Sequence, residues 1–261
     1  MTIINHELRQ SRLSLTVWTA AIGFLIAVCV FLFPEMKGEM DSISDLFASM
    51  GGFTKAFGMD KVSFGTLLGF YAVECGNILG RGGAFFAALA AVSALSKEEQ
   101  GHTAEFLLTH PVSRSRVITE KLLAVVLQLL ILNAAVFCIS LASMALIGEE
   151  IPWREVCLLH LAYLLLQLEL AGICFGISAF LRRGSMGAGL GVAVVMYFLN
   201  LVANITQSAS FLRYLTPFGY ADGTEIAASA TLDGSLLLPG ALLTAAGILA
   251  AYWKYTKKDI A

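Results

Sequence analysis

The chain has 261 residues, of which 57% are hydrophobic and only 14% are charged. A typical soluble domain is about 25% charged, so these few charges cannot cover a globular surface, and the composition indicates a protein of the lipid bilayer. The formal net charge of −2 gives no overall attraction to nucleic acid, and no nucleic-acid partner is expected.

The apolar residues come in long blocks. A hydrocarbon core of about 30 Å needs about 20 helical residues to cross it, and backbone polar groups inside lipid must be satisfied within the segment, so the blocks indicate helices. We therefore predict an all-α, polytopic integral membrane protein with a single transmembrane domain over residues 1–261. The six predicted transmembrane helices cover about 13–33, 65–95, 122–147, 156–181, 186–205 and 235–253.

The first block follows Arg9 and Arg12, as the apolar part of a signal peptide would. It is longer than such a segment, however, and no small-x-small cleavage site follows, so a retained helix is predicted. The preceding segment, 3–11, is expected to form a short interfacial helix on the membrane surface. The second block is longer than one span needs, and we place the span itself in its second half.

Lysine and arginine are unevenly divided between alternate loops, which predicts the orientation of the chain. The richer side holds Arg9, Arg12, Lys97, Arg114, Arg116, Lys121, Arg182, Arg183, Lys254, Lys257 and Lys258. The poorer side holds Lys37, Lys55, Lys61, Arg154 and Arg213. The richer side should be cytoplasmic. We therefore predict that the chain lies in the cell (plasma) membrane with both termini in the cytoplasm.

The charged interval from Lys97 to Lys121 is the most informative loop. Gly101 permits a bend, and the exposed apolar pair Leu107 and Leu108 suits docking to another protein. Ser113 can cap the next helix by accepting a hydrogen bond from a free backbone N–H. An ordinary connecting loop is the alternative interpretation.

This interval also carries a recurring pattern of an acidic pair, a glycine and threonine step, a leucine pair and a proline-serine-arginine step. Its members are Glu98, Glu99, Gly101, Thr103, Glu105, Leu107, Leu108, Pro111, Val112, Ser113, Arg114 and Lys121. The pattern resembles the cytoplasmic loop of ABC-2 type permeases. His102 departs from it, because the family usually has glycine and threonine adjacent. The helix layout, the segment 214–218 and the basic tail 255–260 resemble the family as well.

The resemblance implies that the loop forms a cytoplasmic coupling helix between the second and third spans and docks in a groove of a separate ABC ATPase subunit. The implied coupling residues are Glu98, Glu99, Gly101, Glu105, Leu107, Leu108, Pro111 and Arg114. It also implies a second permease copy or a paralogue, and ATP and Mg²⁺ bound by the partner ATPase. This chain has no GxxxxGK[ST] phosphate loop, so it is expected to hold no cofactor and not to be an enzyme itself.

A few polar residues fall inside the apolar blocks, where a charge normally faces protein or water. Glu169 is a candidate for lining a translocation pathway, with Gln128 and Asn133 as possible neighbours. Glu74 and Arg81 are seven residues apart on one helical face, and we interpret them as interfacial or pairing charges. The four histidines have no metal-ligand spacing, so no metal site is expected.

Several glycines inside the predicted helices are spaced by four residues, as in helices whose backbones approach closely. We single out Gly76 and Gly80, Gly172 and Gly176, and Gly187 and Gly191. The last pair is a candidate for packing between two permease copies, and packing inside one subunit is an equal alternative.

The sequence thus favours the permease subunit of an ATP-powered exporter. A secondary carrier driven by an ion gradient and a non-transporting accessory protein are the alternatives. A carrier of this kind typically has several buried ionisable residues and often has broken helices at the midplane.

Overall fold

The computed structural model describes residues 2–38, 51, 54–55, 61–97, 113–181 and 186–257. Within these ranges the chain is all-α, with six helical segments long and apolar enough to cross a membrane. The elements are α1 (Thr2–Met36), α4 (Leu67–Cys75), η1 (Gly76–Gly82), α5 (Gly83–Val92), α8 (Arg114–Ile147), α9 (Trp153–Ser178), α10 (Met186–Ile205), η2 (Gln207–Leu215), η3 (Pro217–Gly219), α11 (Gly223–Ser229) and α12 (Gly234–Lys257). The elements α4, η1 and α5 follow one another without a gap and together form the second span.

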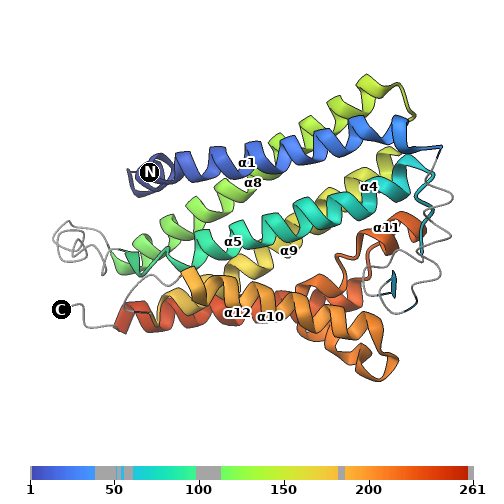
Figure 1. Ribbon diagram of the computed structural model, residues 1–261. Coiled ribbons are helices and arrows are strands. Elements are labelled where there is room, and N and C mark those ends of the chain that lie inside the picture. The colour runs from blue at the N-terminus through green and yellow to red at the C-terminus, as the bar shows by residue number, and fades with distance from the viewer. Residues whose placement is uncertain are drawn as a thin grey trace.

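Helix α9 lies at the centre of the bundle, where it packs on α5 and α12. Helix α1 packs along α8, and α10 packs on α5 and η2. The start of α1 and the end of α12 lie at one end of the bundle, which we call the termini end, whereas α11 and the start of α4 lie at the other, the distal end (Figure 1). Large apolar side chains such as Phe24, Phe198 and Leu242 are exposed on the outer helices, as expected for faces that contact lipid.

Short polar residues set several helix ends. The side chain of Thr66 accepts from the backbone N–H of Gly69 at the start of α4. Ser113 accepts from the N–H of Arg116 at the start of α8, which confirms the predicted cap. At the end of α8, Gly148 has φ 72°, a left-handed conformation that glycine adopts without strain.

The helices extend beyond the apolar blocks at the termini end. Residues 3–11 are helical but form the first turns of α1, rather than a separate interfacial helix, because nothing interrupts the helix before Pro34. Helix α8 begins at Arg114 instead of at 122, and its polar first turns are stabilised by the ion pair between Arg116 and Glu120. The second span also uses the whole of 67–92, not only its second half.

The segment between α10 and α12, which joins the fifth and sixth predicted helices, has structure of its own. It contains η2, η3 and α11, and Phe218, Tyr220 and Ile226 are buried. The hydroxyl of Thr216 donates to the carbonyl of Met196 in α10 at 2.9 Å. The segment therefore returns into the distal end of the bundle and packs on α4, α9, α10 and α12.

Candidate functional site

Most of the predicted coupling residues cannot be placed. Glu98, Glu99, Gly101, Glu105, Leu107, Leu108 and Pro111 lie outside the described residues. Arg114 is the first residue of α8, and its Nη1 donates to the carbonyls of Tyr255 and Thr256 at 3.3 and 3.4 Å. These carbonyls belong to the last turn of α12, where a cation is favourable.

One carboxylate of α1 contacts described residues on both sides of the segment 98–112. Glu7 forms ion pairs with Lys97, the last described residue before the loop, and with Lys121 of α8. The Nζ of Lys121 lies 2.9 Å from Glu7 Oε1 and donates to the carbonyl of Ala94 at 2.8 Å, and this lysine side chain is fully buried. The side chain of Gln10 accepts from Lys97 at 2.9 Å. The start of α1 therefore connects the second span with α8.

A second carboxylate strengthens the same junction. Glu120 of α8 accepts from the backbone N–H of Ile3 at 3.2 Å through Oε2. Its Oε1 accepts from Nε of Arg116 at 2.8 Å. A carboxylate at a helix N-terminus satisfies an otherwise unpaired N–H and complements the helix dipole, so the first turn of α1 is fixed to α8.

The predicted pathway residues of α8 make different contacts. Asn133 donates to its own helix at the carbonyl of Leu129 (2.8 Å) and to Oε1 of Gln167 in α9 (2.6 Å). Gln167 in turn donates to the carbonyl of Leu79 in η1 at 3.3 Å. Gln128 donates within its own helix, to the carbonyl of Ala124 at 3.2 Å. A buried polar link thus joins α8, α9 and η1.

Glu169 faces another neighbour. A Cβ added to Gly240 would lie 2.0 Å from its Oε2, and the hydroxyl of Thr244 donates to its backbone carbonyl at 3.1 Å, so the residue packs against α12. Its Oε2 has no hydrogen-bond partner among the described residues. Because positions 167 and 169 point in opposite directions on a helix, the structure brings Asn133 together with Gln167 and not with Glu169. The pathway role of these residues stays a prediction.

The three glycine pairs have different surroundings. Gly76 and Gly80 accommodate the ring of Tyr163, and Gly172 and Gly176 accommodate α12. The last pair, Gly187 and Gly191, is exposed, and a Cβ at Gly191 would meet nothing within 4 Å. Packing inside the subunit therefore accounts for the first two pairs, and packing between copies stays a prediction for the third.

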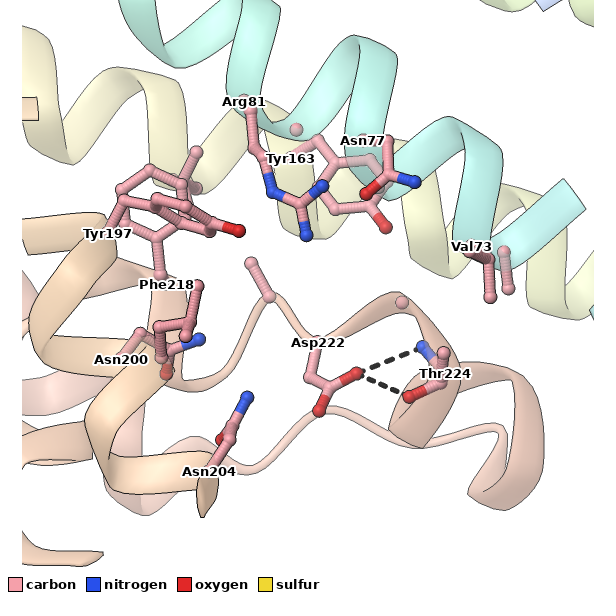
Figure 2. A pocket seen from close by; sticks show the side chains of 17 residues that line it. Val73, Asn77, Arg81, Tyr163, Tyr197, Asn200, Asn204, Phe218, Asp222 and Thr224 are labelled. Atoms are coloured by element: carbon pink, nitrogen blue, oxygen red, sulfur yellow. Dashed lines mark hydrogen bonds between the residues drawn. The ribbon is translucent and has the colours of Figure 1, made fainter. Parts of the chain in front are cut away.

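A polar cavity of about 50 Å³ lies in the distal half of the bundle, between η1, α9, α10 and residues 218–224 (Figure 2). This volume holds a few water molecules. Tyr163 is 1% exposed, and its hydroxyl has no hydrogen-bond partner in the described ranges. The Oδ1 of Asn200, on the α10 side, is also buried and unpartnered there. The cavity therefore leaves polar atoms available for a ligand or for water.

The wall on the η1 side is a π-helix, a wide-turned form that is rare and often occurs at functional sites. Its residues Asn77 and Arg81 line the cavity. The guanidinium carbon of Arg81 lies 4.8 Å from the ring centroid of Tyr197, a cation–π contact. Asp222 and Glu74 are also electrostatic neighbours of Arg81. The interpretation of Glu74 and Arg81 as pairing charges stays a prediction.

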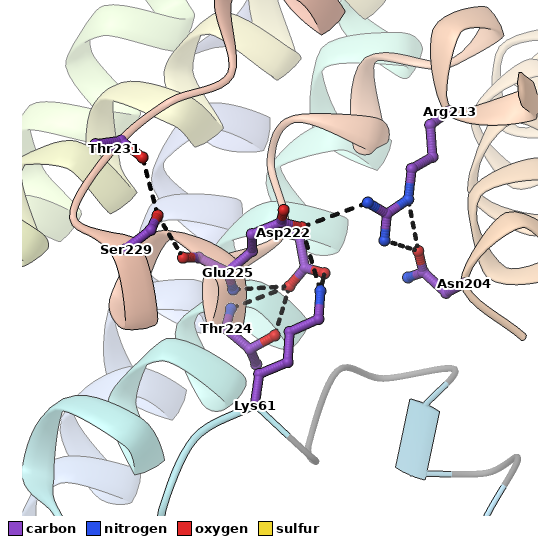
Figure 3. Close-up of polar contacts among 8 residues, drawn as sticks. All are labelled: Lys61, Asn204, Arg213, Asp222, Thr224, Glu225, Ser229 and Thr231. Atoms are coloured by element: carbon purple, nitrogen blue, oxygen red, sulfur yellow. Dashed lines mark hydrogen bonds and ion pairs between the residues drawn. The ribbon is translucent and has the colours of Figure 1, made fainter. Parts of the chain in front are cut away.

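The opposite wall contains a polar cluster at the distal end (Figure 3). Asp222 caps α11 by accepting from the N–H groups of Thr224 and Glu225 at 3.1 and 3.3 Å, and its Oδ2 lies 3.1 Å from Nζ of Lys61. Lys61 also lies 3.2 Å from Glu225. Arg213 donates to Oδ1 of Asn204 at 2.8 Å and lies 3.5 Å from Glu225.

The ionisation of this cluster follows from its contacts. Burial raises the pKa of Asp222, but the charge of Lys61 and the hydrogen bonds from Thr224 and Glu225 outweigh burial, so the net pKa is lowered. Burial lowers the pKa of Lys61, but Asp222 and Glu225 outweigh burial, so its net pKa is raised. Both groups are therefore charged over the ordinary pH range, and each neutralises the other.

Several of these residues were not singled out from the sequence. Asp222 and Glu225 have the spacing of a capping box, which could have located the start of α11. Tyr163 and Gln167 are four residues apart and share a face of α9, but both look like ordinary residues of an apolar block. Their roles depend on η1 and on the returning segment, whose positions are not visible in the sequence.

Comparison with known proteins agrees with this architecture. The family described as ABC-2 family transporter protein matches residues 1–260. No curated protein matches the chain. Because the match covers nearly the whole chain and the described residues contain six apolar helices, the chain belongs to the ABC-2 transporter family and is a multi-pass membrane permease of an ABC transporter.

Proposed function

We propose that this chain is the membrane-spanning subunit of an ABC exporter, which forms the substrate pathway and docks a separate ATPase through the loop 98–112. Glu7 carries the argument, because it pairs with Lys97 before the loop and with Lys121 after it. A loop that receives force from a partner must be firmly connected to the helices that move with it. The contacts of Glu7 supply this connection.

In the proposed orientation, the chain lies in the plasma membrane and its termini end faces the cytoplasm. Described cations at this end include Arg9, Arg12, Lys97, Arg114 and Lys254, which agrees with the positive-inside rule. Helix α5 ends and α8 starts at this same end (Figure 1), so the proposed coupling loop joins them on the ATPase side. A cytoplasmic ATPase would then meet it directly.

The proposed mechanism follows the continuity of the elements. Hydrolysis of ATP by the partner supplies the force, and this chain transmits it. Displacement of the loop would pass into the second span and into α8, and α1 would follow because Glu7 and Glu120 bind its first turns to them. Because packed helices shift as units, such a movement can open a pathway alternately to each side.

A second permease copy completes the proposal. A Cβ added at Gly191 of α10 would meet no atom of the described residues within 4 Å. Val195 and Phe198 are exposed near it. Small residues beside exposed apolar ones suit close helix packing in a membrane, so we place the interface between copies on α10.

The test is co-purification of the chain with its cognate ATPase in detergent, followed by measurement of ATP hydrolysis. We expect that Glu105→Ala together with Leu108→Ala abolishes co-purification and lowers hydrolysis in the complex. The matched control is Glu149→Ala with Leu146→Ala. This glutamate and leucine lie at the distal end, Leu146 in the last turn of α8 and Glu149 just after it. The control complex should assemble normally.

Two outcomes would contradict the proposal. If the loop variant binds the ATPase and supports hydrolysis like the unaltered chain, the coupling assignment is wrong. If no ATPase binds and the chain alone transports solute when an ion gradient is applied, the protein is a secondary carrier. Glu169 is then the first residue to alter.

A further inference from the structure

Two lysines in the last turn of α12, Lys254 and Lys257, have no acidic partner among the described residues. The carboxylates that the structure describes at this termini end belong to Glu7 and Glu120, and both form ion pairs with cations outside α12. The two lysines are three residues apart, so they project from the same side of the helix. They form a positive surface without a counter-charge in the described part of the chain.

Capping of α12 does not occupy these lysines. Basic residues in the last turn of a helix often bond its free carbonyls, but here Arg114 of α8 has that role. Its Nη1 donates to the carbonyls of Tyr255 and Thr256 at 3.3 and 3.4 Å. The two ammonium groups make no hydrogen bond to a described residue, so their donors are available to an external group.

An aromatic ring accompanies each lysine. The Nζ of Lys254 lies 5.9 Å from the ring centroid of Phe180, just after α9, and the Nζ of Lys257 lies 5.3 Å from that of Trp253. The two aromatic residues are 51% and 59% exposed. Tryptophan is enriched where a membrane meets water, and lysines near helix ends extend toward the headgroups. These four residues, which we call the lysine–aromatic patch, have the composition of a surface at headgroup level.

The length of α12 agrees with this level. The helix has 24 residues, which span about 36 Å at 1.5 Å per residue, whereas the hydrocarbon core is about 30 Å thick. The last turn therefore lies near the edge of the hydrocarbon core. Leu249, four residues before Trp253 and on the same side of the helix, is 68% exposed. The patch thus continues into an apolar face that lipid chains can cover.

We propose that the lysine–aromatic patch binds the headgroup of an anionic phospholipid in the leaflet at the termini end. Both ammonium groups hold the phosphate, and an acyl chain lies along α12 beside Trp253 and Leu249. A lipid fits better than a protein partner, because the positive surface and the exposed apolar face are continuous along one helix. The site does not depend on coupling to an ATPase, because all of its residues belong to this chain.

The experiment uses the full chain purified in a neutral detergent. Native mass spectrometry measures how much phosphatidylglycerol and phosphatidylcholine with the same acyl chains the protein retains from mixed micelles. The unaltered chain should retain phosphatidylglycerol selectively. A lysine near an anionic headgroup contributes about fivefold in affinity, so Lys254→Gln together with Lys257→Gln should lower the selectivity about 25-fold. The melting temperature of the variant should stay unchanged, because both side chains lie at the surface of α12.

Two control variants make the result specific. Lys254→Arg with Lys257→Arg keeps both charges and should keep the selectivity. Arg9→Gln with Arg12→Gln removes two exposed charges from the same end of the bundle, on α1, and should also keep it.

Three results would overturn the proposal. The first is no selectivity in the unaltered chain, or equal selectivity in the glutamine variant of the two lysines. The second is an equal loss in the Arg9 and Arg12 variant, which would show an effect of net charge alone. The third is a glutamine variant of the lysines that keeps its lipid selectivity but no longer co-purifies with the cognate ATPase, which would assign the patch to a protein interface.

Discussion

Glu7 and Lys121 form an ion pair across 114 residues of sequence, with 2.9 Å between Oε1 and Nζ and with the lysine side chain fully buried. The same carboxylate binds Lys97, so one residue of α1 holds the second span and α8 together. A buried ion pair does not by itself add much stability, but removal of one partner strands a charge. The pair therefore fixes where these helices meet.

Replacement of Glu7 by Gln should destabilise the chain, because the buried ammonium group of Lys121 would lose this carboxylate. Breaking a buried pair costs about 3 kcal/mol or more, which should lower the apparent melting temperature in detergent by several degrees. In the proposed exporter, the variant should also uncouple ATP hydrolysis from transport.

The double variant Glu7→Gln with Lys121→Met provides the control. It removes the buried ammonium group as well and keeps a long apolar side chain in the same space, so most of the stability should return. If the single Glu7→Gln variant melts like the unaltered chain, the pair does not hold the junction together.

Glycines of the same spacing should respond differently to one added methyl group. A Cβ at Gly176 would lie 2.6 Å from the backbone carbonyl oxygen of Gly247, whereas a Cβ at Gly191 would meet nothing within 4 Å. Overpacking costs about 1–3 kcal/mol, so Gly176→Ala should lower the melting temperature and Gly191→Ala should leave it unchanged.

The larger substitution Gly191→Leu then tests the proposed interface on α10. It should leave the melting temperature of the single chain unchanged and reduce crosslinking between single cysteines placed along α10. Equal crosslinking in Gly191→Leu and the unaltered background would exclude this face as the contact between copies.

The sequence predicted the helices well where apolar blocks decide them, and α10 has the bounds expected from its block. The apolar blocks did not show how far α1 and α8 extend into polar sequence, where Glu7 pairs with Lys121 and Glu120 accepts from the backbone N–H of Ile3. For α8, the Ser113 cap did indicate the start. The sequence could not foresee the cavity at Tyr163. That site requires the π-helix η1 and the returning segment around Phe218, and both depend on packing between distant parts of the chain.

The ion pair between Asp222 and Lys61 should make the stability of the distal end of the bundle depend on pH, at both low and high pH. The pKa of Asp222 lies below its ordinary 3.8, so its contribution is present above that pH and is lost as the pH falls through the lowered value. The pKa of Lys61 lies above its ordinary 10.5, so its contribution is present below that pH and is lost as the pH rises through the raised value.

The variant Asp222→Asn isolates the charge, because asparagine also caps helices. At neutral pH it should lose about 1 kcal/mol, typical of a partly exposed ion pair, and the loss should vanish under acidic conditions where Asp222 of the unaltered chain is protonated. Melting curves of both proteins across this pH range provide the measurement. A loss that persists unchanged in acid would show that the carboxylate charge is not what stabilises α11.

The link between Asn133 and Gln167 predicts a coupling that Gln128 lacks. Asn133 donates to Gln167 at 2.6 Å, whereas the hydrogen bond of Gln128 in the described part of the chain stays within α8. Polar pairs between membrane helices contribute about 0.6 kcal/mol on average and up to about 1.7 kcal/mol. A double-mutant cycle of Asn133→Leu and Gln167→Leu should therefore show a positive coupling energy in this range, whereas Gln128→Leu and Gln167→Leu should be additive. A structural pair and a pathway pair would both show coupling, so transport by the same variants has to separate them. Full transport once stability is restored would assign Asn133 to helix packing. A selective loss of transport would assign Asn133 to the pathway.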